Sequence, residues 1–244
     1  MKQIDINCDL GEGLGNEALL MPYLSSCNIA CGGHAGDIET MTSVVKLAEK
    51  HHVKIGAHPS FPDKENFGRK LICMSASDLY KTFENQIKAL IMVLKSMNLE
   101  LNHVKPHGAL YNLASVDEET AQIIVNVIRD IDQNLILYAP FQSVISKIAI
   151  DNGLKVMFEG FADRNYNKDL TLVSRQNNNA IIGDSELIFE HVFRMISEEK
   201  VKTISGVEEV VKVDTFCVHG DHKNVIENLK FLTLKLKQNS INIL

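Results

Sequence analysis

The sequence predicts one α/β domain built as a seven-stranded (β/α) barrel, distorted or incomplete relative to a TIM barrel, with an open wound sheet as second choice. Apolar β-type runs alternate along the chain with segments whose apolar residues recur every three or four positions. The runs show little polar alternation, as expected when helices cover a parallel sheet. Short polar clusters rich in Gly, His, Asp and Glu follow the runs. Repeated βα units of this kind give either architecture.

Seven short apolar runs are the candidate core strands, one fewer than a complete TIM barrel has. They lie at about 3–8, 27–31, 53–57, 101–105, 135–139, 155–159 and 214–219.

Helix signals fall between these runs. Ser75 and Asp78 start a helix over 75–97, and Ser115 with Glu118 three residues later is a capping box that starts another. A further helix begins near residue 38. The last apolar stripe consists of Val225, Leu229, Leu232 and Leu236.

Two stretches do not fit plain βα units within the single domain 1–244. Residues 160–183 lack a clear helix, and so long a loop in a compact domain is usually a lid or a binding loop. Residues 201–213, with Ser205 and Gly206 in the middle, predict an appended β-hairpin.

Composition narrows the class of protein. The chain has 244 residues, 45% of them apolar, with a formal charge of -6 and a pI near 5.8. Nucleic acid and anionic membranes are therefore not expected partners. The sequence lacks a signal-peptide pattern, and its five cysteines lack CxxC spacing. These features predict a cytoplasmic protein with reduced, mostly buried thiols.

The histidines are concentrated in or beside the polar clusters. Five of the nine are placed so: His34, His58, His107, His219 and His222. Barrels of this kind carry their chemistry on the loops that follow the strands. The sequence therefore predicts one shared pocket at the strand exits.

The first cluster contains Asp9 and Glu12 among glycines. The glycines alone could mean a tight turn, but two carboxylates at a strand exit can also act as a general base or hold a cation. Asn16 stands where a GxGxxG fingerprint needs its last glycine, and the chain has no GxxxxGK[ST] motif.

The second and third clusters contain His34, Asp37 and His58. Asp37 is a good N-cap, and that role alone would explain it. His34 lies among glycines that let a ligand approach the backbone, and Pro59 holds His58 extended. One histidine at a strand end is usually structural, but several in equivalent places favour a functional site.

In the fourth cluster, Lys105 shares a strand face with His103 and His107. A lysine that points into a barrel needs an anionic partner. That partner is either a structural Asp or Glu, or a carboxylate or phosphate of the substrate.

Arginines on the loops could bind such an anion, since the guanidinium fork suits carboxylate and phosphate. Arg69 follows Gly68, and Arg164 and Arg175 lie on the 160–183 loop. Glu159 and Asp163 are expected to orient these cations.

Taken in order, the clusters resemble the LamB/YcsF family over nearly the whole chain, from 5–13 to 217–221. The stretches 105–112 and 161–164 are the most diagnostic. Gly33 stands where the family usually carries an aromatic residue, and this smaller residue is expected to enlarge the pocket mouth. Asn179 stands where a glycine is common. The resemblance implies a barrel of the glycoside hydrolase/deacetylase type.

The family's characterised role implies the A subunit of an ATP-dependent 5-oxoprolinase, which converts 5-oxo-L-proline to L-glutamate while ATP becomes ADP and phosphate. The B and C subunits would be obligate partners, and ATP would be a co-substrate of the complex. Whether the chain binds a divalent metal or associates with itself is left open. The expected catalytic residues are Asp9, Glu12, His34, His58 and His107. The expected substrate- or phosphate-binding residues are Asn7, Asp37, Lys105, Glu159, Asp163, Arg164, Arg175, His219 and Asp221.

Two other functions stay open at this stage. One is a metal-dependent, deacetylase-like hydrolase of carbohydrate amides, for which carboxylate and imidazole ligands would suit Zn²⁺. The other is a non-catalytic subunit that binds the substrate while its partners perform the chemistry.

Overall fold

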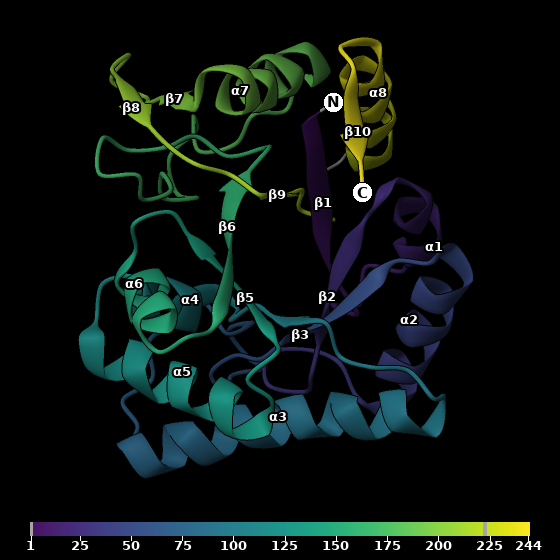
Figure 1. Ribbon diagram of the computed structural model, residues 1–244, viewed down its shortest axis with the longest axis vertical. Coiled ribbons are helices and arrows are strands. Elements are labelled where there is room, and N and C mark those ends of the chain that lie inside the picture. Colours follow the sequence, from purple (N-terminus) through teal and green to yellow (C-terminus); the bar gives the residue numbers. More distant parts are fainter. Residues whose placement is uncertain (1, 222–223) are drawn as a thin grey trace.

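The predicted barrel is confirmed in the computed structural model, which describes residues 2–221 and 224–244. Within them, parallel strands form a closed ring, because β1 pairs with both β2 and β9 and β9 also pairs with β6. In ring order these strands are β1 (Lys2–Leu10), β2 (Ser26–Ala30), β3 (Lys54–His58), β4 (His103–Val104), β5 (Ile136–Pro140), β6 (Lys155–Phe161) and β9 (Thr215–Cys217). Figure 1 shows the helices arranged around this ring.

The helices connect successive strands and cover the outside of the ring. They are α1 (Glu17–Leu20), α2 (Ile38–His51), α3 (Ala76–Ser96), α4 (Gly108–Ala114), α5 (Glu118–Ile131), α6 (Val144–Asp151), α7 (Ser185–Glu198) and α8 (Val225–Gln238), with a 3₁₀ turn η1 (Met21–Tyr23). Among the described residues, none of the helices is long and apolar enough to span a bilayer.

Two helix starts were expected at serines, and one of them is wrong. Ser75 caps α3 by accepting a hydrogen bond from the Asp78 backbone N–H. Ser115 instead follows the end of α4, and its hydroxyl donates to the Tyr111 carbonyl. Asp117 caps α5, because a carboxylate directly before the first turn accepts the Thr120 N–H.

Three segments add to the barrel. The hairpin expected over 201–213 forms between β7 (Lys200–Lys202) and β8 (Glu208–Val210). A strand that the sequence did not suggest, β10 (Ile241–Ile243), pairs parallel with the start of β1. The 160–183 loop has no regular helix and is held by isolated bridges from Arg164 to Ile181 and from Tyr166 to Leu172.

The barrel interior is polar, contrary to the expectation of little polar alternation. Along β1, Asp5, Asn7 and Asp9 alternate with apolar residues and contact residues of other strands. Asp5 accepts hydrogen bonds from Ser26 and Thr215, each at 2.6 Å. The apolar residues between them join the packed layer under the helices, so the alternation runs polar inside and apolar outside.

This polar interior continues upward as a hydrogen-bonded ladder. Asn28 Nδ2 donates to Asn7 Oδ1 and Asp9 Oδ1, each at 2.8 Å, and Asn28 Oδ1 lies 2.8 Å from His103 Nε2. His103 stacks on Tyr138 with ring centroids 3.9 Å apart. Because these buried groups hold one another, they fix the strand register beneath the site.

His191 on α7 should make stability depend on pH. Its Nε2 is buried with no hydrogen-bond partner among the described residues, and burial lowers the pKa of His191 from 6.5 to about 4. Between pH 6.5 and pH 4, His191 is therefore protonated in the unfolded chain but neutral in the folded chain. Stability from this group is complete above pH 6.5 and is lost as the pH falls toward 4, by about 2 kcal/mol at pH 5.

Urea unfolding at pH 7.5 and pH 5 of the natural protein and of His191→Phe measures this loss. The variant keeps a ring beside Tyr166, which lies 5.9 Å away between centroids, but has no titrating group. We expect a smaller loss of stability on acidification in the variant. Equal losses in the two proteins would contradict the assignment.

Candidate functional site

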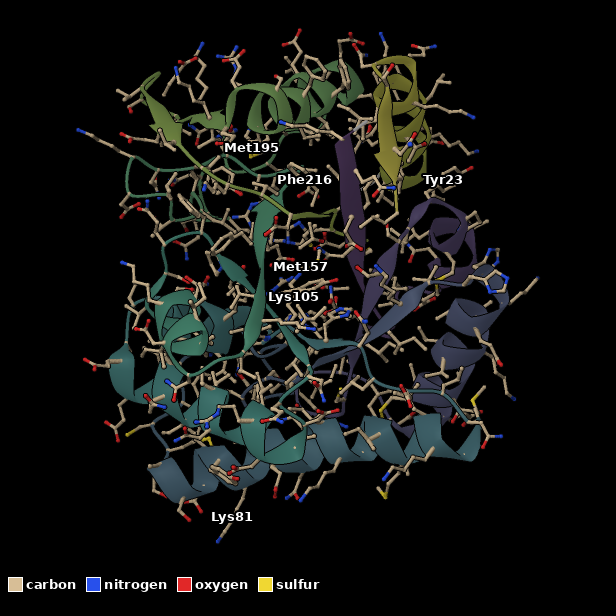
Figure 2. The ribbon with its side chains drawn as sticks, in the orientation of Figure 1. Tyr23, Lys81, Lys105, Met157, Met195 and Phe216 are labelled. Carbon is tan, nitrogen blue, oxygen red and sulfur yellow. The ribbon has the colours of Figure 1, made fainter. Side chains whose placement is uncertain are left out.

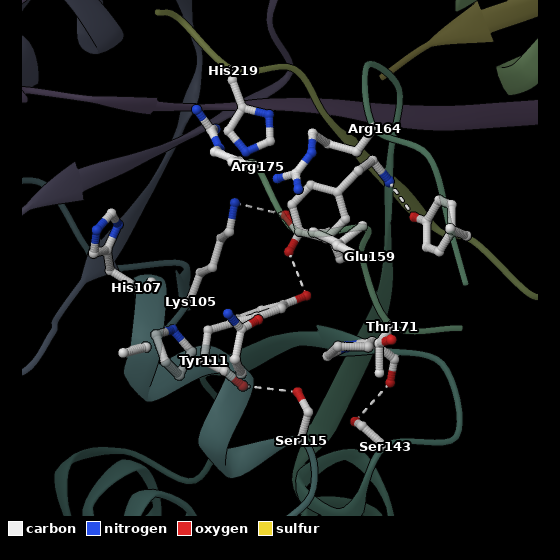
Figure 3. Close-up of a pocket in the computed structure, with 18 of the residues that line it drawn as sticks. Lys105, His107, Tyr111, Ser115, Ser143, Glu159, Arg164, Thr171, Arg175 and His219 are labelled. Carbon is white, nitrogen blue, oxygen red and sulfur yellow. Dashed lines mark hydrogen bonds and ion pairs between the residues drawn. The ribbon is translucent and has the colours of Figure 1, made fainter. Parts of the chain in front are cut away.

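A cavity of about 750 Å³ lies at the carboxyl ends of the barrel strands. Asp9, Glu12, His58 and His107 line its floor, and residues 169–176 of the 160–183 loop form one wall. Figure 3 shows Lys105, Glu159, Arg164 and Arg175 converging on this space, and Figure 2 places Lys105 near the middle of the ring of strands. The volume falls within the range of about 300–1,000 Å³ typical of small-molecule sites.

Lys105 is the central cation of the floor, and its ammonium group is almost completely buried. Its Nζ lies 2.9 Å from Asp9 Oδ1, 2.9 Å from Glu159 Oε1 and 3.2 Å from Cys217 Sγ. Burial alone would lower the pKa of Lys105, but Asp9 and then the Cys217 and Glu159 groups raise it well above its usual value. The ammonium therefore stays charged, and its hydrogens already have partners within the protein.

Asp9 is the matching fixed anion. Burial favours its neutral form, but opposite charge nearby, including the Lys105 ammonium 2.9 Å away, outweighs burial and holds the pKa of Asp9 well below its usual value. The sequence left open whether the anionic partner of Lys105 belongs to the protein or to the substrate. The partners are carboxylates of the protein, Asp9 and Glu159.

Glu12 lies beside three imidazoles. Its Oε1 is 3.0 Å from His34 Nε2, 3.5 Å from His107 Nδ1 and 3.9 Å from His58 Nε2. Burial, and then the charge of Asp9, raise the pKa of Glu12. The rings of His34 and His107 stack in parallel with centroids 3.6 Å apart.

Backbone carbonyls fix the tautomers of two of these imidazoles. His58 Nδ1 donates to the Lys105 carbonyl at 2.8 Å, and His107 Nε2 donates to the Phe67 carbonyl at 3.0 Å. In the neutral rings, the lone pairs of His58 Nε2 and His107 Nδ1 therefore face each other across 2.9 Å. Burial lowers the pKa of His34 to about 3 and that of His107 to about 2, so both rings are neutral at pH 7.

Charged residues surround the upper part of the cavity. His219 Nδ1 donates to Asp163 Oδ1 at 2.8 Å, and Arg175 Nη1 donates to Asp221 Oδ2 at 2.8 Å. Arg164 donates to the carbonyls of residues 173 and 180, which holds the loop, and burial and then the nearby Arg175 lower its pKa. Two guanidinium groups that repel each other beside a cavity form an environment that favours an anion.

Not every residue expected at the site lines the cavity. Asp37 is an exposed N-cap of α2 that accepts the Thr40 N–H at 2.8 Å, so the structural explanation suffices for it. Asn7, His34 and Asp163 lie behind the lining residues and orient Glu159, Glu12 and His219, respectively. His222 lies outside the described residues.

The expected effect of Gly33 on the pocket mouth is wrong. Gly33 does not line the cavity, and a Cβ there would lie 2.3 Å from Gln86 Oε1 and 2.4 Å from Ser60 Oγ. Glycine at this position therefore makes room for Gln86, which bonds to the backbone of Ser60.

Sequence reasoning missed several residues of the site. Tyr111 lines the cavity and donates to Glu159 Oε2 at 2.7 Å, and its position one helical turn after His107 was the available signal. Arg69, by contrast, is one of the loop arginines named from the sequence, and it lines the cavity with Nη2 3.7 Å from Asp221 Oδ2. Asn28, which orients Asp9, gave no signal because it lies within a short apolar run.

Comparison with known proteins identifies relatives over the full length of the chain. It is 42% identical to the 5-oxoprolinase A subunit of Natranaerobius thermophilus, covering 100% of this chain and 96% of that one. It is 40% identical to the 5-oxoprolinase A subunit of Pyrococcus furiosus, covering 99% and 97%. The crystal structure of a lactam utilization protein from Thermus thermophilus superposes with a TM-score of 0.93 at 36% identity, covering 100% and 99%.

A more distant structure, a T48 deacetylase with substrate, matches with a TM-score of 0.50 at 12% identity and shares the fold alone. The model of the LamB/YcsF family matches residues 4–244. The chain therefore belongs to the LamB/YcsF family.

Proposed function

We propose that this chain is the A subunit of an ATP-dependent 5-oxoprolinase and that it opens the lactam of 5-oxo-L-proline together with the B and C subunits. The observation that carries the proposal is the group of Glu12, His58 and His107 on the floor of a cavity sized for a small molecule. The names of relatives about 40% identical over the whole chain support the substrate and the place in the complex.

The lactam is a stable amide, so opening it needs an activated carbonyl carbon. Phosphorylation of the lactam oxygen by ATP would release ADP and activate that carbon. Water would then attack the carbon and lose a proton, the ring C–N bond would break as the nitrogen takes up a proton to become the amino group of glutamate, and phosphate would leave. Glu12 is the best-placed proton acceptor for this water, because it lines the cavity and its ionic contacts among the described residues are to imidazoles rather than to a lysine or arginine. Asp9 is less suited, since Lys105 and Asn28 already occupy its Oδ1.

The imidazole tautomers limit what His58 and His107 can do as catalytic residues. Their N–H groups are used by the carbonyls of Lys105 and Phe67, so in the neutral form neither ring can donate a hydrogen bond to a developing oxyanion. They present lone pairs to the site instead.

The substrate carboxylate, or a phosphate, fits best at the arginines. Each of the three Lys105 hydrogens has a partner, whereas a guanidinium has five N–H donors. Arg69, Arg164 and Arg175 line the upper cavity, and their contacts with Asp221 and the loop carbonyls use only some of these donors. We therefore assign anion binding to this arginine group rather than to Lys105.

Arg175→Gln should weaken substrate binding more than it slows chemistry. A charge-assisted hydrogen bond that is equally strong in the ground and transition states affects KM, so we expect KM for 5-oxoproline to rise about tenfold with little change in kcat. Steady-state kinetics of the reconstituted complex measure both constants. Arg129→Gln, on the surface of α5, is the matched control, and an unchanged KM in Arg175→Gln would remove Arg175 from the site.

Mixing the purified chain with the B and C subunits and following glutamate release from 5-oxoproline tests the proposed function. We expect release only when all three subunits and ATP are present. Release that continues without this chain would contradict the proposal. If the chain binds 5-oxoproline but its Glu12 and His107 variants leave turnover of the complex unchanged, the chain is a non-catalytic binding subunit. If the chain hydrolyses an acetylated sugar without ATP, the activity is deacetylase-like.

A further inference from the structure

Four potential ligand atoms lie close together on the cavity floor. Glu12 Oε1, His34 Nε2, His58 Nε2 and His107 Nδ1 all lie within 4.8 Å of one another. The three histidines are buried, and Glu12, His58 and His107 face the cavity. The residues come from three strand exits and the first glycine-rich loop, so the barrel fold itself brings them together.

The facing atoms of His58 and His107 are two hydrogen-bond acceptors with no hydrogen between them when both rings are neutral. The N–H groups of His58 and His107 are committed to backbone carbonyls, so the inward nitrogens are acceptors that lie only 2.9 Å apart. Asp9 Oδ2 adds a further acceptor 3.3 Å from His58 Nε2. Lone pairs at such distances repel one another unless a positive charge lies between them.

The charges around these atoms allow a divalent cation. Lys105 carries one positive charge between the carboxylates of Asp9 and Glu159, which leaves this group with a net charge of about -1. The carboxylate of Glu12 adds a further acidic group beside the imidazoles of His34 and His107. A divalent ion would bring the whole floor close to neutrality, which favours its burial.

We propose that Glu12, His34, His58 and His107 bind one divalent transition-metal ion, for which Zn²⁺ is the best-fitting probe. Tetrahedral coordination with bonds of about 2.0–2.1 Å places ligand atoms about 3.3 Å apart. The measured separations of 2.9, 3.0, 3.5 and 3.9 Å lie on both sides of that value. Three imidazoles with one carboxylate favour Zn²⁺ or Co²⁺ over Mg²⁺, which prefers oxygen ligands and water.

Such an ion would place a positive charge on the cavity floor beside the imidazoles. It would lie where the cavity is lined by Glu12, His58 and His107, and would act on an amide carbonyl as a Lewis acid. The second oxygen of Glu12 would stay available to accept a proton from water.

The test uses the whole chain alone, freed of metal by dialysis against a chelator. Zinc chloride is titrated in a calorimeter, and cobalt chloride in a visible spectrophotometer. We expect one ion per chain, visible cobalt bands typical of a four-coordinate site, and no comparable heat from magnesium chloride. Zinc at a hundredfold excess over Kd should raise the Tm by about 5–10 °C.

Glu12→Gln and His107→Gln should each weaken zinc binding by at least tenfold, and His51→Gln, on α2 away from the cavity, should not change it. Circular dichroism of each variant checks that it is folded, and the zinc-dependent Tm of the natural chain does not depend on any variant. Absence of stoichiometric zinc binding to the natural chain would overturn the proposal. The 2.9 Å contact between His58 Nε2 and His107 Nδ1 would then be a hydrogen bond with one shared proton. Undiminished binding in both variants would overturn it as well.

This binding test and the activity test of the complex can fail separately. Zinc binding by a chain whose complex releases no glutamate would contradict the proposed function and support the metal site. Glutamate release by a complex whose chain binds no zinc would support the function and overturn the metal site.

Discussion

Replacing Glu12 by Gln is expected to reduce glutamate release by the reconstituted complex about 10²–10⁴-fold, the usual contribution of a general base. Glutamine has the same shape but accepts no proton, and Glu12 is a cavity-lining carboxylate without a lysine or arginine ion pair among the described residues. Glu12 lies on a half-buried loop, so the fold should survive the change.

Glu39→Gln, on the exposed first turn of α2, is the matched control for this loss. It makes the same chemical change away from the cavity and should retain full turnover. Stopped assays of glutamate and of ADP in parallel show whether ATP consumption falls with lactam opening. A Glu12→Gln complex that turns over like the control would remove Glu12 from the chemistry.

Lys105→Met should cost both stability and activity, because it leaves Asp9 and Glu159 buried without their cation. Removing one partner of a buried ion pair costs about 3–5 kcal/mol of unfolding free energy. Both carboxylates lie 2.9 Å from the ammonium. Among the described residues, no other lysine or arginine lies at that distance from either carboxylate. Urea unfolding at pH 7.5 measures the loss.

The double variant Lys105→Met/Glu159→Gln separates the charge effect from lost packing. Neutralising one of the stranded carboxylates should restore about 1 kcal/mol or more relative to Lys105→Met alone, since the two sites are coupled. Lys147→Met, on the exposed face of α6, should leave stability within about 0.5 kcal/mol. A Lys105→Met chain as stable as this control would show that the ion cluster contributes nothing.

The outline of the barrel could be predicted because several core strands contain short apolar runs bounded by turn residues. The runs near 27–31, 53–57 and 135–139 correspond to β2, β3 and β5 within one or two residues. The strand β10 was missed because it is only three residues long at the chain end, and its pairing with β1 depends on tertiary contact.

The polar interior was harder to recognise, because polar alternation normally indicates a sheet face in water. In β1 the polar side chains instead face one another across the closed barrel. Only closure of the ring gives Asp5, Asn7 and Asp9 their partners, and a single strand carries no sign of it.

The membership of the site was more predictable than the roles within it. The positions of His58, Lys105 and His107 follow from strand ends, and the structure brings them together around Asp9 and Glu12. Which nitrogen of each ring carries hydrogen depends on carbonyls at Lys105 and Phe67, a detail of backbone direction that no sequence pattern gives.

A structure of the assembled complex with 5-oxoproline bound, determined without ATP, tests most directly whether this cavity is where the lactam is opened. We expect the lactam ring on the floor beside Glu12, His58 and His107, with its carboxylate toward Arg69 and Arg175. A lactam bound in another subunit, or at the opposite end of this barrel, would contradict the assignment of the reaction to this site.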